Sequence, residues 1–467
     1  MSGNPGGNNR FDVLVIGAGP GGMAAATRGA LKGLKVGLVN GKRLWGYGIQ
    51  GAYKSKGMYE LAKDHLVASK SDRGYLPSSV KLDFGQVQAQ LQQGSGELEA
   101  LYQEQIERLS IVELRGMAAF VDPHTVRVAG ADHRADKIII ATGTTPRWLP
   151  AVHQDGELIM SSDEIVSLDR LPESLLILGA GVIGCEFASI FNAFGCQVTL
   201  LDAYPVILSH EDDDIIDFLT QTFRTNGIHV VQSARMVDMR AAGGRVVTRL
   251  KDGSEFDTDM ALVSIGRVAC TAALKLENAG VAVNANGFLP ISDFCQTNVD
   301  HIYAVGDVGL RDSELDMCLV HVAEAEGHQA IHHLLSGQKP ISMDHIPFII
   351  FTLPLVAGAG DNEKTARAKY GDVRVARLAN IRSHRAHAMR SFGGFVKLIV
   401  GPEGDDRILG VRACGPQADT LIGEVSLCIA NELPYTHLMD AVHAHPSLSE
   451  SLHNVARMLA GLYPSTD

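Results

Sequence analysis

The first 184 residues of this 467-residue chain contain no cysteine. Seven cysteines follow, and no two of them stand at a Cys-x-x-Cys or zinc-ligand spacing. They are Cys185, Cys196, Cys270, Cys295, Cys318, Cys414 and Cys428. Isolated thiols of this kind are typical of buried side chains in a cytoplasmic protein. The sequence therefore predicts neither a disulfide framework nor a cysteine metal site.

Positive charge is also scarce, with 41 Lys and Arg against 53 Asp and Glu and a net charge of −12. This balance argues against nucleic acid or an anionic membrane as a partner, because both attract clustered basic residues. No apolar run approaches the roughly 18 to 20 residues of a membrane helix, and the start MSGNPGGNNR lacks the apolar core of a secretion signal. We expect a cytoplasmic protein without a membrane span. Its length predicts about three domains.

Two polar clusters suggest metal binding and are interpreted otherwise. The acidic run Glu211 to Asp214 is read as a solvated helix start, where negative charge suits the helix dipole. His328 and His332 have the i, i+4 spacing of helical metal ligands, but a polar helix face explains them as well. No metal site is predicted.

Glycine is abundant, with 49 residues, and two glycine turns carry the main signal. The first follows an apolar strand at residues 11–16 and precedes an Ala-rich helix; it contains Gly17, Gly19 and Gly22 in a G-x-G-x-x-G pattern. The first glycine permits the turn, the second lets backbone approach a pyrophosphate, and the third packs helix on strand. The next strand ends in Asn40, where a carboxylate normally receives the ribose hydroxyls, so we expect weaker ribose recognition there.

The second turn repeats the pattern with Gly179, Gly181 and Gly184, again between a strand and a helix. The strand that follows ends in Asp202, whose carboxylate can bond both ribose hydroxyls of NAD and would repel a 2′-phosphate. No Arg follows closely to receive such a phosphate. The pattern therefore favours NADH over NADPH.

Two such folds, with strand ends at Thr142-Gly143 and Gly306-Asp307, resemble the class I flavoprotein disulfide reductases, which include dihydrolipoamide dehydrogenase. The resemblance implies an α/β protein with two Rossmann-like domains, one for FAD and one for NAD(H), and a C-terminal α+β domain that forms a homodimer. The expected domains are residues 1–150 (FAD, first part), 151–270 (NAD), 271–345 (FAD, second part) and 346–467 (dimerisation).

Single residues match the family as well. By resemblance, Asp307 bonds the FAD ribityl chain, and Lys56 pairs with Glu186 near the flavin N5, where hydride arrives. The segment from His443 to Glu450 follows the C-terminal signature, in which His445 is an acid/base oriented by Glu450 and serves the partner subunit's flavin.

One part of the family pattern is missing. Relatives place two cysteines beside the flavin just ahead of the Ser-Lys that corresponds to Ser55-Lys56, and here Gly48 and Ala52 stand nearest to those positions. Disulfide exchange needs two sulfurs within bonding reach, so disulfide reduction by the family mechanism is excluded. We expect the lost side chains to leave space beside the flavin, near Trp45, Tyr47 and Tyr53. The family's Thr-x-Pro-Glu also becomes Thr-Leu-Pro-Leu at 352–355, which removes an acid.

These observations predict an enzyme that takes hydride from NADH onto FAD and passes electrons directly to a small-molecule, non-disulfide acceptor such as a quinone. Two alternatives remain open. One is a flavin dehydrogenase that oxidises a small substrate and reduces NAD. The other is a catalytically degenerate relative that keeps FAD as a structural element and acts as a partner or redox sensor.

Overall fold

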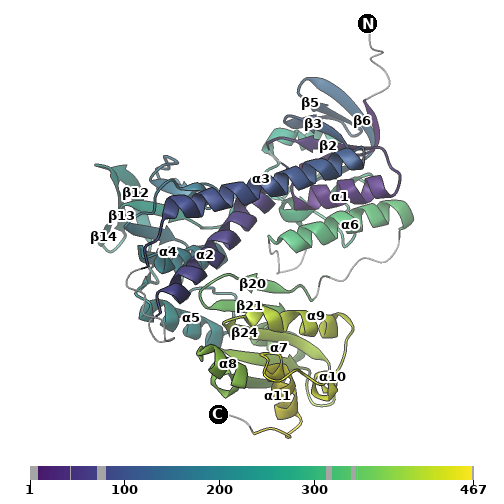
Figure 1. Cartoon of the computed structure of the whole chain (residues 1–467). Helices are drawn as coiled ribbons and strands as arrows, with labels where there is room; N and C mark the ends of the chain where they lie inside the picture. Colours follow the sequence, from purple (N-terminus) through teal and green to yellow (C-terminus); the bar gives the residue numbers. More distant parts are fainter. Residues whose placement is uncertain are drawn as a thin grey trace.

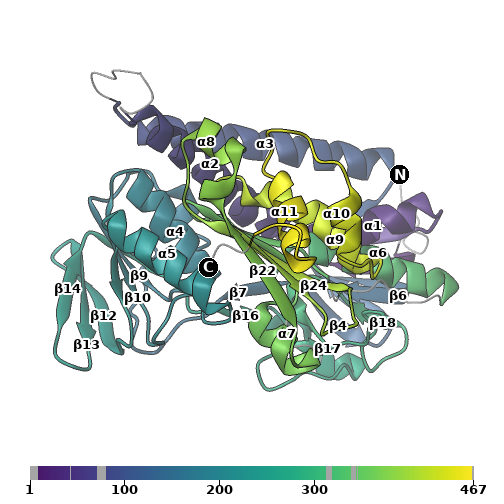
Figure 2. The same ribbon diagram turned by 90° about the horizontal axis from the view of Figure 1, so that it is seen from below.

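The computed structural model describes residues 9–42, 44–70, 80–311, 318–337, 343 and 345–464. It contains two α/β folds and an antiparallel C-terminal sheet with its own helices (Figures 1 and 2). This architecture confirms the predicted fold class. The domain boundaries at 150, 270 and 345 stay predictions.

The first α/β fold is built on a seven-stranded sheet of order β3-β2-β1-β6-β5-β4, with β18 paired to β6. Strand β1 runs parallel to both β2 and β6, so the carboxyl ends of these strands meet at one edge. Helices α1 and α6 pack against each other beside the sheet (Figure 1). The bounds are β1 Arg10–Ile16, α1 Pro20–Leu31, β2 Val36–Asn40, β3 Val112–Arg115, β4 Ala118–Asp122, β5 Thr125–Val128, β6 Ala131–Ile140, β18 Ile302–Ala304 and α6 Val320–Ser336.

The second α/β fold has a parallel sheet of order β11-β10-β9-β15-β8. A three-stranded antiparallel sheet, β12-β13-β14, follows it, and the short strands β7 and β16 pair with each other between the two folds. The bounds are β7 Thr144–Pro146, β8 Ile159–Ser161, β9 Ser174–Leu178, α4 Val182–Ala193, β10 Gln197–Leu201, α5 Asp213–Thr225, β11 His229–Val231, β12 Met236–Ala242, β13 Arg245–Leu250, β14 Glu255–Thr258, β15 Met260–Val263 and β16 Arg267–Ala269.

Two long helices extend from the first fold and pack against the second. A π-helical turn, Gly48–Tyr53, leads directly into α2 (Lys54–Ala68), which packs against α4. Helix α3 (Phe84–Arg108) packs on α2 and extends across the molecule from the first fold toward the second (Figure 1). The residues that end the π-helical turn are therefore held between both nucleotide folds.

The C-terminal sheet has the order β20-β21-β24-β23-β22, and its neighbouring strands are antiparallel. Helices α9 and α11 pack on it (Figure 2). This confirms the predicted change from βαβ units to an α+β arrangement. The bounds are β20 Phe348–Ile350, β21 Leu355–Gly360, α7 Glu363–Tyr370, β22 Arg374–Ala379, α8 His384–Met389, β23 Phe395–Val400, β24 Ile408–Gly415, α9 Ile422–Ala430, α10 Thr436–Asp440 and α11 Glu450–Leu459.

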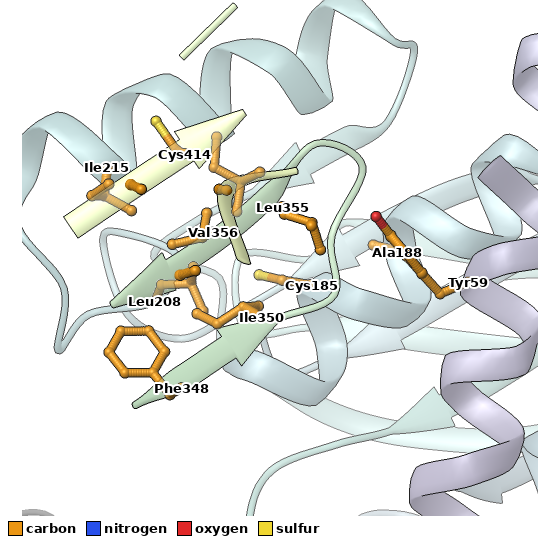
Figure 3. Packing of buried hydrophobic residues seen from close by; sticks show 14 of the residues in the cluster. Tyr59, Cys185, Ala188, Leu208, Ile215, Phe348, Ile350, Leu355, Val356 and Cys414 are labelled. Atoms are coloured by element: carbon orange, nitrogen blue, oxygen red, sulfur yellow. The ribbon is translucent and has the colours of Figure 1, made fainter. Parts of the chain in front are cut away.

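The largest hydrophobic core joins the second fold to the C-terminal sheet. Figure 3 shows Cys185 and Leu208 of the second fold beside Ile350, Leu355 and Val356 of the C-terminal segment. All five side chains are buried. Because apolar burial is the main favourable term in folding, this shared core fixes the C-terminal sheet against the nucleotide fold.

The prediction that the acidic run Glu211 to Asp214 is solvated is wrong in part, because Asp212, just before α5, is buried in an ion pair. Lys397 of β23 is 2% exposed and its Nζ lies 2.8 Å from Asp212, 2.9 Å from Asp214 and 3.2 Å from Glu363. Burial alone would lower the pKa of Lys397, but the hydrogen bonds to Asp212 and Asp214 outweigh it and the pKa is raised. The run thus ties the second fold to the C-terminal sheet by charge.

Within the described residues, no helix combines the length and the apolarity required to cross a bilayer. A cytoplasmic location stays a prediction.

Replacing Lys397 by Met tests the buried charge cluster. The variant leaves Asp212 buried without its cation, so we expect a loss of about 3 to 5 kcal/mol of stability, read from the shift of the urea midpoint. Arg249→Gln, which breaks an exposed pair with Glu255, is the matched control and should shift the urea midpoint little. Equal losses in the two variants would show that the buried cluster has no special weight.

Candidate nucleotide and active site

The first glycine turn has the geometry that a dinucleotide requires. Gly17 has a φ of +113°, and a Cβ there would overlap the backbone of Ala141, while a Cβ on Gly22 would overlap the carbonyl of Gly17. At Gly19, by contrast, a Cβ would meet nothing within 4 Å. Gly17 and Gly22 therefore allow close packing, and Gly19 leaves open space at the helix N-terminus, a geometry that is compatible with the predicted pyrophosphate contact.

Asn40 lies beside this turn, since Gly17 N–H donates to the carbonyl of Val39 at 3.0 Å. Its side chain is buried, and its amide nitrogen donates to Glu113 Oε1 at 2.9 Å. A cavity of about 430 Å³ lies at this end of the sheet and is lined by Asn40, Glu113 and Arg115 among others. The cavity has room for a nucleoside at the strand end where the sequence predicted a ribose.

The second turn repeats the first. Gly179 has a φ of +106° and packs against the backbone of Ser264, Gly184 packs on Gly179, and Gly181 faces open space. Asp202 accepts hydrogen bonds from the backbone N–H groups of Ala180 and Tyr204. These bonds hold the carboxylate at the end of β10, next to the open glycine.

The two strand ends of the first fold also come together. Asp307 accepts a hydrogen bond from Thr144 Oγ1 at 3.3 Å, and Gly306 N–H donates to Glu326 at 2.6 Å. The hydroxyl of Thr142 is shielded from solvent and has no hydrogen-bond partner among the described residues. Gly143, next in the chain, has a φ of +65°. A buried hydroxyl without a described partner, beside the first glycine turn, fits a polar cofactor such as FAD.

Lys56 and Glu186 form the pair that the resemblance predicted, although 130 residues separate them. Lys56 Nζ donates to both carboxylate oxygens, at 3.0 and 3.2 Å. Glu186 Oε1 also accepts from Phe351 N–H at 2.9 Å, and the Phe351 ring lies 4.9 Å from Lys56 Nζ. Glu186 is buried on α4, whereas the Lys56 side chain is 35% exposed.

The turn before α2 is covered by aromatic rings. A Cβ on Gly48 would overlap the ring of Trp45, and one on Gly51 would overlap the ring of Tyr47. The space expected at Gly48 is therefore filled, which corrects that prediction. Trp45 stacks on Tyr102 of α3 at 4.6 Å, and Tyr53 packs its hydroxyl against Gly94 of the same helix.

Among the aromatic side chains of this turn, Tyr47 contacts the polar residues Ser162 and Arg267. Its hydroxyl donates to Ser162 Oγ at 3.3 Å, and the Arg267 guanidinium lies 4.4 Å from its ring centroid. Arg267 in turn pairs with Asp163 at 3.2 Å and donates to Thr144 Oγ1 at 2.8 Å. Burial raises the pKa of Tyr47 despite the nearby Arg267, so the phenol stays protonated at neutral pH.

Sequence reasoning missed Arg267 and Asp163. Arg267 directly follows Gly266, which ends the strand-then-glycine segment of the second fold, but nothing in the local pattern shows that its guanidinium crosses to the turn before α2. The available signal was the residue type: arginine is suited to buried ion pairs and to stacking on aromatic rings.

Within the described residues, none of the seven cysteines forms a disulfide. Five are buried, and burial raises the pKa of Cys185 well above its ordinary value and that of Cys196 to about 12. Cys270 and Cys318 are exposed. Thiols with raised pKa values are poor nucleophiles at neutral pH, because the thiolate is the reactive form.

His445 and Glu450 meet as predicted. His445 Nδ1 lies 2.8 Å from Glu450 Oε1, and Ser447 N–H donates to Glu450 Oε2 at 3.0 Å. Burial would raise the pKa of Glu450, but these hydrogen bonds lower it, so the residue is a carboxylate at neutral pH. His445 is 59% exposed in the single chain, and its ring lies edge-on to His384 at 5.1 Å. The carboxylate orients an imidazole whose other nitrogen is accessible.

His328 and His332 both lie on α6. Burial lowers the pKa of His328. Across the described part of the chain, no group of three or more His, Cys, Asp or Glu side chains is arranged to hold a metal ion.

Two folds with open glycine turns, joined to an antiparallel sheet, define a flavoprotein oxidoreductase that uses a pyridine nucleotide. The model of the pyridine nucleotide-disulphide oxidoreductase family matches residues 11–327, and that of its dimerisation domain matches residues 346–456. The chain belongs to this family, which uses FAD and NAD(H), and the dimerisation domain supports a homodimer.

Relatives match along almost the whole chain. A dihydrolipoyl dehydrogenase of Bacillus subtilis is 33% identical and covers 96% of this chain and 99% of its own, and the mitochondrial one of Schizosaccharomyces pombe is 31% identical over 95% and 89%. Among solved structures, the HOCl-induced flavoprotein disulfide reductase RclA of Escherichia coli has 28% identity and a TM-score of 0.85, covering 96% of this chain and 100% of its own. LpdA of Mycobacterium tuberculosis has 25% identity and a TM-score of 0.88, with 97% and 99% covered.

Substitutions at Glu186 test whether its carboxylate stabilises the fold by joining Lys56 to the backbone of Phe351. Glu186→Ala removes the acceptor of both Lys56 and Phe351 N–H, so we expect a loss of about 2 to 3 kcal/mol in thermal or urea unfolding. Glu186→Gln keeps an oxygen for Phe351 N–H and should lose about 1 kcal/mol less. Glu60→Gln, on the exposed side of α2, is the control and should change stability little. If the Ala and Gln variants unfold alike, the bond to Phe351 contributes nothing.

Proposed function

We propose that the chain is an NADH-dependent flavoenzyme that delivers electrons directly to a small non-disulfide acceptor, such as a quinone. FAD, when bound, supplies the hydride acceptor and the two-electron store of the reaction. The protein's task is then to hold both nucleotides, to exclude a sulfur relay and to manage protons.

The composition of the turn before α2 carries the proposal. Residues 44–55 contain no cysteine, and the rings of Trp45 and Tyr47 fill the space at Gly48 and Gly51. A dithiol relay requires two sulfurs within bonding reach. The relatives named dihydrolipoyl dehydrogenase and disulfide reductase share the fold, but we infer that this chain lacks their redox-active cysteine pair.

The first glycine turn, with Gly17, Gly19 and Gly22, would hold the FAD pyrophosphate, and Thr142, Gly143, Gly306 and Asp307 would hold the rest of that cofactor. The second turn, with Gly179, Gly181 and Gly184, would hold the nicotinamide nucleotide. Asp202 favours NADH because its fixed carboxylate repels a 2′-phosphate.

Lys56 and Glu186 would act where the hydride moves. The ammonium of Lys56 is held by a buried carboxylate, and its side chain remains partly exposed. A fixed cation there stabilises negative charge that develops on a reduced cofactor, and its position requires no rearrangement during the reaction.

His445 would transfer a proton to or from the acceptor. Glu450 fixes its ring through Nδ1 and leaves Nε2 free for that transfer. Because His445 is exposed in one chain and lies in the segment matched by the dimerisation domain, we infer that it serves the site of the partner subunit.

Anaerobic titration with NADH tests the electron count. A flavin-only enzyme takes up about two electrons per FAD, whereas an enzyme with an additional redox-active disulfide takes up about four. We expect about two, read from the flavin absorbance. The Cys270→Ser variant, which removes an exposed thiol, is the control and should give the same value. Uptake of four electrons that falls to two in this variant would sink the proposal.

Replacing His445 by Gln tests the proton role. The amide keeps polarity but does not titrate, so we expect reoxidation by a quinone to slow about 100-fold or more while reduction by NADH changes little. Stopped-flow measurement of the two half-reactions separates these rates. His384→Gln alters the histidine that contacts His445 and is the control, with both rates expected near the wild-type values. Unchanged reoxidation in His445→Gln would remove the residue from the reaction.

A further inference from the structure

The end of β2 is the one place in the first glycine fold where a neutral side chain replaces the expected carboxylate. Asn40 is buried there, and its own Oδ1 accepts from Lys42 N–H at 3.3 Å. Its amide nitrogen is committed to Glu113. An amide in this state has one oxygen that is already engaged, so it is a weak acceptor for a ribose diol.

A carboxylate is nevertheless present, one strand further along the sheet. β3 pairs in parallel with β2, with Leu38 opposite Glu113 and Asn40 opposite Arg115. Glu113 is 13% exposed and lines the same cavity as Asn40. Its Oε1 accepts from Asn40 and its Oε2 from Arg115 at 3.2 Å.

These two bonds orient the carboxylate without saturating it. An ionised carboxyl group has about four acceptor sites, and the described partners use two of them. Glu113 lines a cavity of about 430 Å³ at the ends of β2 and β3, so the remaining acceptor capacity is available to a ligand there.

We propose that Glu113 supplies the carboxylate that binds the ribose hydroxyls of the adenosine half of FAD, and that Asn40 is a positioning residue that holds Glu113 in place. This inference rests on the proposed binding of FAD to the first glycine fold. It also accounts for Asn40: an acid at position 40 would place two negative charges side by side in a mostly buried site, which is unfavourable. The neutral Asn40 and the acidic Glu113 then belong to one linked change. Ribose recognition is therefore not weakened, in contrast to what Asn40 alone predicts.

The test compares FAD with an analogue whose adenosine ribose lacks both hydroxyls. Binding to the full-length apoprotein is measured by quenching of flavin fluorescence. We expect the wild type to prefer FAD about 10-fold or more, the value of a hydrogen bond to a charged group. Glu113→Gln and Glu113→Ala should bind FAD less tightly and lose most of that preference, while their affinity for the analogue changes little.

Two further variants separate recognition from folding. The double variant Asn40→Asp with Glu113→Gln returns a single carboxylate to the end of β2 and should recover much of the preference for FAD. Asp136→Asn removes an exposed carboxylate of the same sheet and should leave both affinities unchanged. The temperature at which holoenzyme releases FAD should fall in Glu113→Gln and recover in the double variant.

The outcomes are distinguishable. A wild type that binds FAD with a strong preference over the analogue, together with a Glu113→Gln variant that keeps the same preference, would overturn the role of Glu113 and leave the FAD site intact. A wild type that binds neither molecule would overturn both the role of Glu113 and the assignment of FAD to this fold.

Discussion

The carboxylate of Glu186 connects three parts of the chain that are far apart in sequence. It lies on α4 of the second fold, accepts from Lys56 on α2, and accepts from the backbone of Phe351 just before the C-terminal sheet continues. A buried carboxylate is stable only when its oxygens are hydrogen-bonded, so each of these three segments must be in place before the charge is satisfied. The same interaction that holds the segments together therefore also fixes the position of the Lys56 ammonium.

Charge plays a second structural role at the start of α5. Lys397 gathers Asp212, Asp214 and Glu363 around one ammonium, and Arg412 pairs with Glu211 at 2.9 Å nearby. Beside the shared hydrophobic core, these pairs set the orientation of the C-terminal sheet, because ion pairs are directional and apolar contacts are not. This orientation determines where the segment bearing His445 and Glu450 is presented to a partner subunit.

The sequence predicted features that depend on local spacing, and the family resemblance added the distant pair of Lys56 with Glu186. Other long-range pairings were missed. The glycines at 17, 19 and 22 could be assigned roles because each role is a backbone requirement. The acidic run at 211–214 was misread because its cations lie on β23 and β24, about 200 residues later. The expectation of open space at Gly48 was wrong for a similar reason. A missing side chain does not indicate which neighbouring group fills its place, and here the ring of Trp45 occupies it. Asn40 looked like a loss because its partner, Glu113, is a neighbour only across the sheet.

The proposed changes at positions 40 and 113 and in the turn before α2 share one physical logic. In each case a group that the family resemblance predicts at one position is absent, while the neighbouring side chains are hydrogen-bonded: Asn40 bonds Glu113, and Tyr47 bonds Ser162 beneath Arg267. Loss of a function without selection would leave buried polar atoms unpaired, and such atoms destabilise a fold by about 1 to 3 kcal/mol each. A site adapted to another use instead requires that the replacing side chains find hydrogen-bond partners. Under the proposed function, the aromatic and charged surface around Tyr47 must admit an acceptor close to the cofactor, and that surface would then determine which acceptors react.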